Sequence, residues 1–261
     1  MSPDLRERDL TLARHDLTAV LFDFGGTLDA DGVPWSAQFH RAYRALGGAA
    51  DHDTFAAAFR ASDVRLASHT SIATLGFRAM LDLQTTLLAP LLPDGARVDH
   101  TAVVAAVHDA ARRTAARNRD VLATLRGLRL GVVSNFTGNL ERCLDELGLR
   151  TPFDVVLDST VVGMAKPEPA IFREALSRLG ASASRTLMVG DNPFADVRAA
   201  AACGLCTCWL APAERRAPDG VRFDVRIARL DELPAVLGTS AVPNDLPDDL
   251  PDDLPDAACS A

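Results

Sequence analysis

The sequence predicts an α/β fold, with a parallel-sheet core and a block of helices inserted after the first strand. From residue 119 onward, short apolar runs alternate with helical patterns, which is typical of βαβ units. Residues 35–118 instead carry apolar side chains at helical spacing without a strand pattern, which predicts an all-helical insertion. Of the 261 residues, 48% are hydrophobic, enough for a sizeable core with such an insertion.

The first strand is expected at residues 18–22, where an apolar run leads directly into Asp23. Gly25 and Gly26 follow, and glycines there permit a tight turn and the close approach of a ligand to the backbone. Asp23 therefore stands at the carboxyl end of a buried strand, the position at which open parallel sheets bind their ligands.

The insertion follows a turn-rich segment at residues 29–34. One helix is expected from Trp35 to the glycine pair at residues 47–48, and a second helix is expected to be capped by Asp53. Two further helices are expected at residues 71–88 and 101–117.

The second half of the chain supplies the rest of the sheet. Strands are expected at residues 128–135, 153–158, 186–191, 206–210 and 225–230, and helices at 119–126, 137–147, 169–179, 195–202 and 232–237. Ser134 and Asp191 end two of these strands, as Asp23 ends the first. Because the ends of parallel strands meet at one edge, two carboxylates and a hydroxyl gather there, a set suited to a hard divalent cation and a phosphoryl group.

The charge of the chain is uneven. Six acids lie in an Asp-Leu-Pro repeat near the C-terminus, which predicts a disordered acidic tail at residues 239–261. The net charge of −8 comes mostly from that tail, so the folded part lacks the basic footprint of nucleic-acid binding. Since no apolar run suits a membrane span or a signal peptide, a cytoplasmic location is expected. Composition leaves the oligomeric state open.

Four motifs resemble, in the same order, those of the haloacid dehalogenase (HAD) superfamily. They are Asp23-Phe-Gly-Gly-Thr27-Leu28, Ser134-Asn135, Lys166-Pro-Glu-Pro169, and Gly190-Asp191-Asn192 with Asp196. The resemblance runs from residue 18 to residue 237 and implies a Rossmann-like parallel-sheet core with an inserted all-helical cap domain. It divides the chain into a core at residues 17–30 and 119–238, a cap at residues 31–118, and the tail.

The resemblance implies catalytic roles for three residues. Asp23 matches the nucleophile that attacks phosphorus and forms an aspartyl phosphate. Ser134 matches the donor of a hydrogen bond to the phosphoryl oxygens, and Lys166 matches the cation between Asp23 and the phosphoryl group. Lys166 is also the one lysine among 27 basic residues, which indicates a need for a compact ammonium at this position.

The same resemblance implies a Mg2+ cofactor. The expected ligands are the carboxylates of Asp23, Asp191 and Asp196 and the backbone carbonyl of Gly25, with Asp196 either a ligand or the anchor of one. The residues expected to bind substrate are Gly26, Thr27 and Asn135. The function implied is that of a Mg2+-dependent phosphatase acting on a small phosphorylated metabolite.

Gly25 departs from the family pattern, because the phosphatases carry there a second aspartate as general acid and base. Such help is worth about 10²–10⁴-fold in rate. In one outcome a cap residue or water supplies the proton, with Asp29, Asp31, His40 and His69 as candidates. In another, the leaving group needs no acid, or the phosphoryl group goes to an acceptor other than water. In the third, the protein binds a phosphorylated ligand or a partner with little or no turnover.

Two groups of relatives in the superfamily also lack that aspartate. Phosphonoacetaldehyde hydrolases use a cap lysine, and residues 29–118 contain none, which excludes that mechanism. Haloacid dehalogenases carry a tyrosine in place of Gly25 and need no metal, whereas Asp191 and Asp196 favour a metal. The sequence therefore favours phosphoryl chemistry over dehalogenation.

Overall fold

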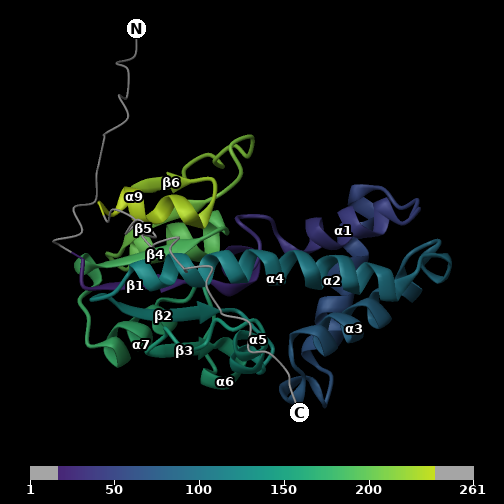
Figure 1. Cartoon of the computed structure of the whole chain (residues 1–261), viewed down its shortest axis with the longest axis horizontal. Coiled ribbons are helices and arrows are strands. Elements are labelled where there is room, and N and C mark those ends of the chain that lie inside the picture. Colours follow the sequence, from purple (N-terminus) through teal and green to yellow (C-terminus); the bar gives the residue numbers. More distant parts are fainter. Residues whose placement is uncertain (1–16, 239–261) are drawn as a thin grey trace, which may run out of the picture.

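The computed structural model describes residues 17–238 and contains the predicted parallel sheet beside a helical cap (Figure 1). All neighbouring strands run parallel, in the order β3-β2-β1-β4-β5-β6. The strands are β1 (Ala19–Phe22), β2 (Arg129–Ser134), β3 (Val155–Asp158), β4 (Thr186–Gly190), β5 (Cys206–Leu210) and β6 (Val225–Ile227). The α/β prediction is confirmed, while the predicted tail at residues 239–261 lies outside the described residues.

Nine α-helices are described between residues 17 and 238. They are α1 (Trp35–Ala45), α2 (His52–Ala67), α3 (Phe77–Leu88), α4 (His100–Thr124), α5 (Leu140–Glu146), α6 (Ser159–Val162), α7 (Pro169–Leu179), α8 (Ala199–Ala202) and α9 (Leu233–Val236). Helices α1 to α3 and the first part of α4 form the cap, which lies to the right of the sheet in Figure 1.

The central strand β1 is buried on both faces because helices cover both sides of the sheet. Val20 and Phe22 point into a cluster shared with side chains of α4, α5 and α9. Ala19 and Leu21 point the other way, into a cluster with α7 and α8. A strand enclosed in this way needs apolar side chains at every position, which is the pattern that predicted it.

Helix α4 is continuous where the sequence predicted two helices, at residues 101–117 and 119–126. It carries the chain from the cap back to the sheet (Figure 1). No glycine or proline interrupts residues 100–124, and Asn118 is held inside the helix by donating from Nδ2 to the carbonyl of Leu28, 2.9 Å away. The two segments that cross between core and cap are thus bonded to each other.

Two helix starts in the cap differ from the predicted ones. Asp51, rather than Asp53, caps α2, because its side chain accepts a 2.8 Å hydrogen bond from the backbone N–H of Thr54. Helix α3 begins at Phe77, after Gly76, and not at residue 71. Periodicity alone does not fix which of several polar residues turns inward to cap.

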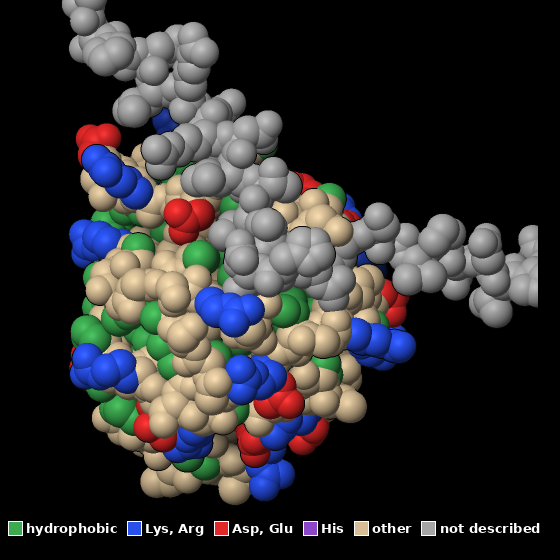
Figure 2. All heavy atoms as spheres, turned by 90° about the vertical axis from the view of Figure 1, so that its left-hand side faces the viewer, with side chains coloured by type: hydrophobic (Ala, Val, Ile, Leu, Met, Phe, Trp, Pro, Cys, Tyr) green, Lys and Arg blue, Asp and Glu red, His purple; other side chains and the backbone are tan. Residues whose placement is uncertain are grey.

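The surface carries both signs of charge. Figure 2 shows the end of the core that faces away from the cap, where basic and acidic side chains are scattered singly rather than gathered by sign. Among residues 17–238, none of the helices combines the length and apolarity of a membrane-spanning segment.

Candidate active site

Three buried carboxylates and one ammonium meet at the carboxyl ends of β1 and β4. Oxygens of Asp23, Asp191 and Asp196 all lie within 4.8 Å of one another. The Nζ atom of Lys166 lies 2.7 Å from Oδ1 of Asp23 and 2.6 Å from Oδ1 of Asp196. Residues separated by up to 173 positions in the sequence are therefore brought into one cluster.

Asp191 is placed by the turn that follows β1. The Oγ1 atom of Thr27 accepts a 3.1 Å hydrogen bond from the backbone N–H of Asp191 and lies 3.4 Å from its Oδ1. Gly26 has φ of +91°, and a Cβ there would lie 2.8 Å from Oδ1 of Asp191. A glycine is required at this point, because a side chain would both strain the backbone and displace the carboxylate.

Asp196 is placed by the turn that follows β4. The Asn192 side chain caps this turn by accepting from the backbone N–H groups of Phe194 and Ala195, both at 3.0 Å. The backbone N–H of Asn192 in turn donates to Oδ2 of Asp196 at 2.9 Å. A Cβ at Gly190 would lie 2.4 Å from the Asp196 carboxylate, so glycine there admits it.

Lys166 is held by Asn135, at the end of β2. The Asn135 side chain accepts from the backbone N–H of Lys166 and donates to its carbonyl, each at 2.7 Å. Ser134 is buried at the end of β2, one residue beyond the level of Asp23 on the neighbouring strand. Three residues expected to bind substrate therefore also position the cluster. Gly26 leaves room for the carboxylate of Asp191, Thr27 accepts a hydrogen bond from Asp191, and Asn135 bonds the backbone of Lys166.

Burial and mutual repulsion dominate the electrostatics of the cluster. Burial raises the pKa of Asp191 well above its usual range, and the charges of Asp23 and Asp196 raise it further. Burial likewise raises the pKa of Asp196 to about 6, against the opposing pull of Lys166. For Lys166 burial alone lowers the pKa, but the attraction of Asp196 and Asp23 outweighs it and raises the pKa above its usual value.

The donor set fits a hard divalent cation. Three carboxylates face one ammonium, so the cluster carries excess negative charge in a buried place. Carboxylate and carbonyl oxygens are the ligands that Mg2+ prefers in proteins, and Mg2+ commonly binds through one or two carboxylates. Asp23 and Asp191 would hold the ion, with the backbone carbonyl of Gly25 and with Asp196.

Arg215 is a residue of the site that no sequence motif indicated. Its Nη1 donates to the backbone carbonyl of Asp191 at 3.2 Å and lies 3.9 Å from Oδ2 of that residue. Its guanidinium lies over the ring of Trp209, 5.8 Å from the centroid. Arg215 follows β5 in a segment without any pattern that tells it from the other arginines, so only the tertiary structure identifies it.

Aromatic rings form the wall beside Gly25. Phe24, Trp35, Phe77 and Phe136 contact one another edge to face, with ring centroids 5.4–6.3 Å apart. They come from the turn after β1, from the starts of α1 and α3, and from the segment after β2. Trp35 and Phe136 are only half-buried. This aromatic wall joins residues of the core, Phe24 and Phe136, to residues of the cap, Trp35 and Phe77.

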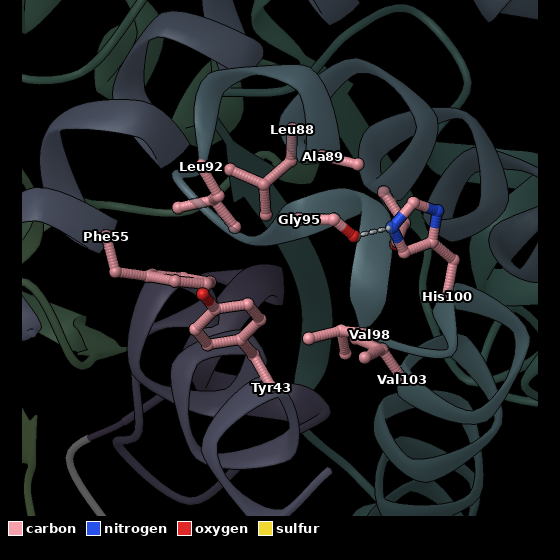
Figure 3. Close-up of a pocket in the computed structure, with 10 residues that line it drawn as sticks. Tyr43, Phe55, Leu88, Ala89, Leu92, Gly95, Val98, His100 and Val103 are labelled. Atoms are coloured by element: carbon pink, nitrogen blue, oxygen red, sulfur yellow. Dashed lines mark hydrogen bonds between the residues drawn. The ribbon is translucent and has the colours of Figure 1, made fainter. Parts of the chain in front are cut away.

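The cavity drawn in Figure 3 lies elsewhere, inside the cap. It encloses about 20 Å³ between Tyr43, Phe55 and Val98, and beside it His100 bonds the carbonyl of Gly95 at 2.6 Å. That volume suits about one water molecule. A groove of about 350 Å³ lies between residues 29–34, α1 and α4. Neither cavity is lined by the residues of the acidic cluster.

Comparison with known proteins places the chain among hydrolases. The model of the haloacid dehalogenase-like hydrolase family matches residues 17–204. Pyrimidine 5'-nucleotidase YjjG of Escherichia coli (strain K12) is 37% identical over 120 residues, which are 45% of this chain and 53% of that protein. The alignment therefore spans about half the length of that relative.

Two further proteins resemble a larger part of the chain. Ribulose-1,5-bisphosphate 5-phosphatase of Halopiger xanaduensis is 31% identical over 216 residues, or 76% of this chain and 86% of that protein. The structure of a dehalogenase with an intermediate complex has a TM-score of 0.59 at 18% identity, covering 85% of this chain and 97% of that one. The latter likeness concerns the fold alone.

Proposed function

The chain belongs to the haloacid dehalogenase-like hydrolase family and is a hydrolase, and from that premise we propose that it is a Mg2+-dependent phosphatase for a small phosphorylated metabolite. The observation that supports this most is the cluster of Asp23, Asp191 and Asp196 around Lys166. Carboxylate oxygens of this number suit a divalent cation, and that cation together with the ammonium of Lys166 suits a phosphoryl group.

Asp23 is the nucleophile of the proposed reaction. One of its carboxylate oxygens attacks phosphorus, the bond from phosphorus to the leaving oxygen breaks, and an aspartyl phosphate forms. Lys166, 2.7 Å from Oδ1 of Asp23, faces the phosphoryl oxygens as a positive charge. Ser134, buried at the neighbouring strand end, donates a hydrogen bond to them. Water then attacks phosphorus, and Asp23 returns to its free carboxylate with release of phosphate.

A bound Mg2+ would neutralise the charge that develops on the phosphoryl group. This chain's own residues provide the frame in which that happens. Thr27 and Gly26 hold Asp191 in place, Asn135 holds the backbone of Lys166, and Asn192 orders the turn that carries Asp196.

Phosphate release from a panel of phosphorylated metabolites tests the proposal. We expect Mg2+-dependent release that chelation with EDTA abolishes and that the isosteric change Asp23→Asn reduces to background. Asp120→Asn, an exposed aspartate on α4, is the matched control and should keep full activity. The panel includes nucleotides and sugar phosphates, because relatives carry the names nucleotidase and bisphosphate phosphatase.

Three results would overturn the assignment. Chloride release from a chlorinated acid without Mg2+ would make the protein a dehalogenase instead. Absence of turnover across the whole panel, together with Mg2+-dependent binding of a phosphorylated compound, would leave a binding protein. Transfer of the phosphoryl group to an added alcohol in preference to water would make it a phosphotransferase.

A further inference from the structure

The indole ring of Trp35 lies against Gly25, the position at which the family's phosphatases carry the second aspartate. A Cβ built on Gly25 would lie 3.4 Å from both Nε1 and Cε2 of Trp35, and 3.8 Å from Cζ2. The backbone of Gly25, at φ −71° and ψ 116°, is one that any residue adopts. The backbone would therefore accept an aspartate, and its Cβ would stand in van der Waals contact with the indole ring, which limits the directions that the carboxylate can take.

The indole of Trp35 is fixed in that space. Its Nε1 donates to Oδ2 of Asp29 at 2.6 Å, while Oδ1 of Asp29 accepts from the backbone N–H of Gly26 at 2.7 Å. The ring also contacts Phe77 and Phe136 edge to face. Moving the ring would break a partly buried hydrogen bond to a carboxyl group, so the ring stays beside Gly25. A test of the missing acid therefore has to change Gly25 and Trp35 together.

The four groups that were candidates for a replacement acid each have a partner other than Asp23. Asp29 is only 1% exposed, and both of its oxygens accept the bonds just described. The other three pair as follows: Asp31 with Arg117 at 2.6 Å, His40 with the carbonyl of Ala50 at 3.1 Å, and His69 with Ser71 at 2.9 Å. None of the four forms a hydrogen bond or ion pair with Asp23 within the described part of the chain.

From this arrangement we infer that the enzyme acts on phosphates whose leaving group is a weak base, that is, on aryl, enol or acyl phosphates rather than alkyl esters. The inference rests on the proposed phosphatase function. When the bond from phosphorus to the leaving oxygen breaks, that oxygen departs with the electron pair as an anion. An aryloxide, enolate or carboxylate is stable as such, and it takes up a proton later from water.

An alkoxide is far less stable, and its departure normally needs the proton of a general acid, worth about 10²–10⁴-fold in rate. The aromatic wall agrees with the inference. Trp35 and Phe136 keep part of their surface exposed beside Gly25, and aromatic rings pair favourably with a flat, unsaturated leaving group. The charged cluster holds the phosphoryl group and this wall receives what departs from it.

The test compares kcat/KM over a series of phosphates whose leaving groups grow more basic, from para-nitrophenyl through phenyl to alkyl. This parameter reports the steps up to departure of the leaving group and not the later hydrolysis of the aspartyl phosphate. We expect a steep fall along the series, with alkyl phosphates at least about 10²-fold below para-nitrophenyl phosphate. The kcat/KM for acetyl phosphate should be as high as those of the fast substrates.

Variants of Gly25 and Trp35 give a second readout. The double change Gly25→Asp with Trp35→Ala restores a carboxylate and the space for it, and should raise kcat/KM for alkyl phosphates by about 10²-fold or more and flatten the series. Gly25→Asp alone should gain less, since the ring restricts the new carboxylate. Trp35→Ala alone supplies no proton donor, so alkyl phosphates should stay slow in this variant.

The outcomes separate the inference from the function on which it rests. Equal kcat/KM for aryl and alkyl phosphates in the unaltered enzyme overturns the inference and keeps the phosphatase. Preference for alkyl phosphates does the same. No turnover of any compound in the series overturns both. The series on the unaltered enzyme decides the question even where a variant fails to fold.

Discussion

The two sides of the site differ in what they are built from. The phosphoryl side consists of Asp23, Lys166, Asp191 and Asp196, buried charges held by a network of hydrogen bonds. The leaving-group side consists of Gly25, Trp35, Phe77 and Phe136, with Asp29 bonded behind the indole ring. The first side comes from the core alone, and the second is shared between core and cap.

This difference separates two tasks that one active site usually performs together. In the proposed mechanism the phosphoryl side keeps the nucleophile, the cation and the metal ligands, so it retains what is needed to attack phosphorus. The leaving-group side has exchanged a proton donor for an apolar surface. We infer that such a site keeps its nucleophilic chemistry while narrowing the range of groups that can leave.

The largest effect is expected on the phosphoryl side, from Lys166→Met. It removes the one cation between Asp23 and Asp196, which leaves buried carboxylates unpaired at a cost of about 3–5 kcal/mol in unfolding free energy. Phosphatase activity should disappear as well. The conservative Lys166→Arg keeps the charge and most of the stability but not the compact ammonium, so it should stay folded and inactive. Full activity in either variant would contradict the assigned role.

An intermediate effect is expected on the leaving-group side, from the titration of Asp29. Burial raises the pKa of Asp29 to about 7 from 3.8, against bonds from Trp35 and Gly26 that lower it. Between those two pH values the folded protein keeps a proton that the unfolded chain has lost. The free energy of unfolding should therefore fall as pH rises through this window, by up to about 4 kcal/mol from this group.

Asp29→Asn should remove that part of the pH dependence. Urea unfolding at pH 5 and pH 8 measures it, and the comparison of the two proteins isolates Asp29 from the other buried acids. Asp63→Asn offers a control, since desolvation raises the pKa of Asp63 to about 6 as well, but this residue is more exposed and lies in the cap beside Gln84. If the variant shows the same slope as the parent, Asp29 is ionised throughout and the inference about its pKa is wrong.

The smallest effect is expected where the core holds the cap. Oε1 of Glu146, at the end of α5, accepts from the backbone N–H of Arg78 at the start of α3 at 3.0 Å, and lies 3.4 Å from Nε2 of His108. Helix α3 begins with Phe77, so this contact places a ring of the aromatic wall. A carboxylate at a helix start is worth about 0.3–1 kcal/mol.

Glu146→Gln should therefore cost about 1 kcal/mol or less in unfolding free energy. It should also make the link between core and cap more open to proteolysis, while para-nitrophenyl phosphate is still hydrolysed. Glu141→Gln, on the same helix but in an exposed pair with Arg150, is the matched control. Equal proteolysis of the two variants would remove Glu146 from the account of the cap.

The charged side could be predicted from the sequence and the aromatic side could not. Asp23, Ser134 and Asp191 each follow an apolar strand, and the rule that parallel strand ends meet at one edge brings them together without further information. No comparable rule predicts the position of the Trp35 ring. Its ring reaches Gly25 only because α1 starts where it does and Asp29 turns inward, and both depend on tertiary packing.

The same distinction explains the smaller errors. The predicted break between two helices near residue 118 was wrong, because burial of Asn118 against Leu28 keeps α4 continuous. That Asn135 binds substrate stays a prediction, and its bonds to the backbone of Lys166 are a contact that the sequence did not indicate. The sequence did not indicate Arg215, because no pattern around it distinguishes it from the other arginines. Local sequence patterns determine where helices and strands form, whereas the partners of individual side chains depend on the tertiary structure.

The central claim is that Asp23 accepts a phosphoryl group, and trapping that intermediate tests it most directly. The enzyme is mixed with para-nitrophenyl phosphate and Mg2+, quenched in acid within milliseconds, and its peptides are examined by mass spectrometry. We expect a phosphoryl group on the peptide that contains Asp23, absent with EDTA and absent in Asp23→Asn. Rapid phosphate release with no adduct at Asp23, or an adduct on another residue, would contradict the account.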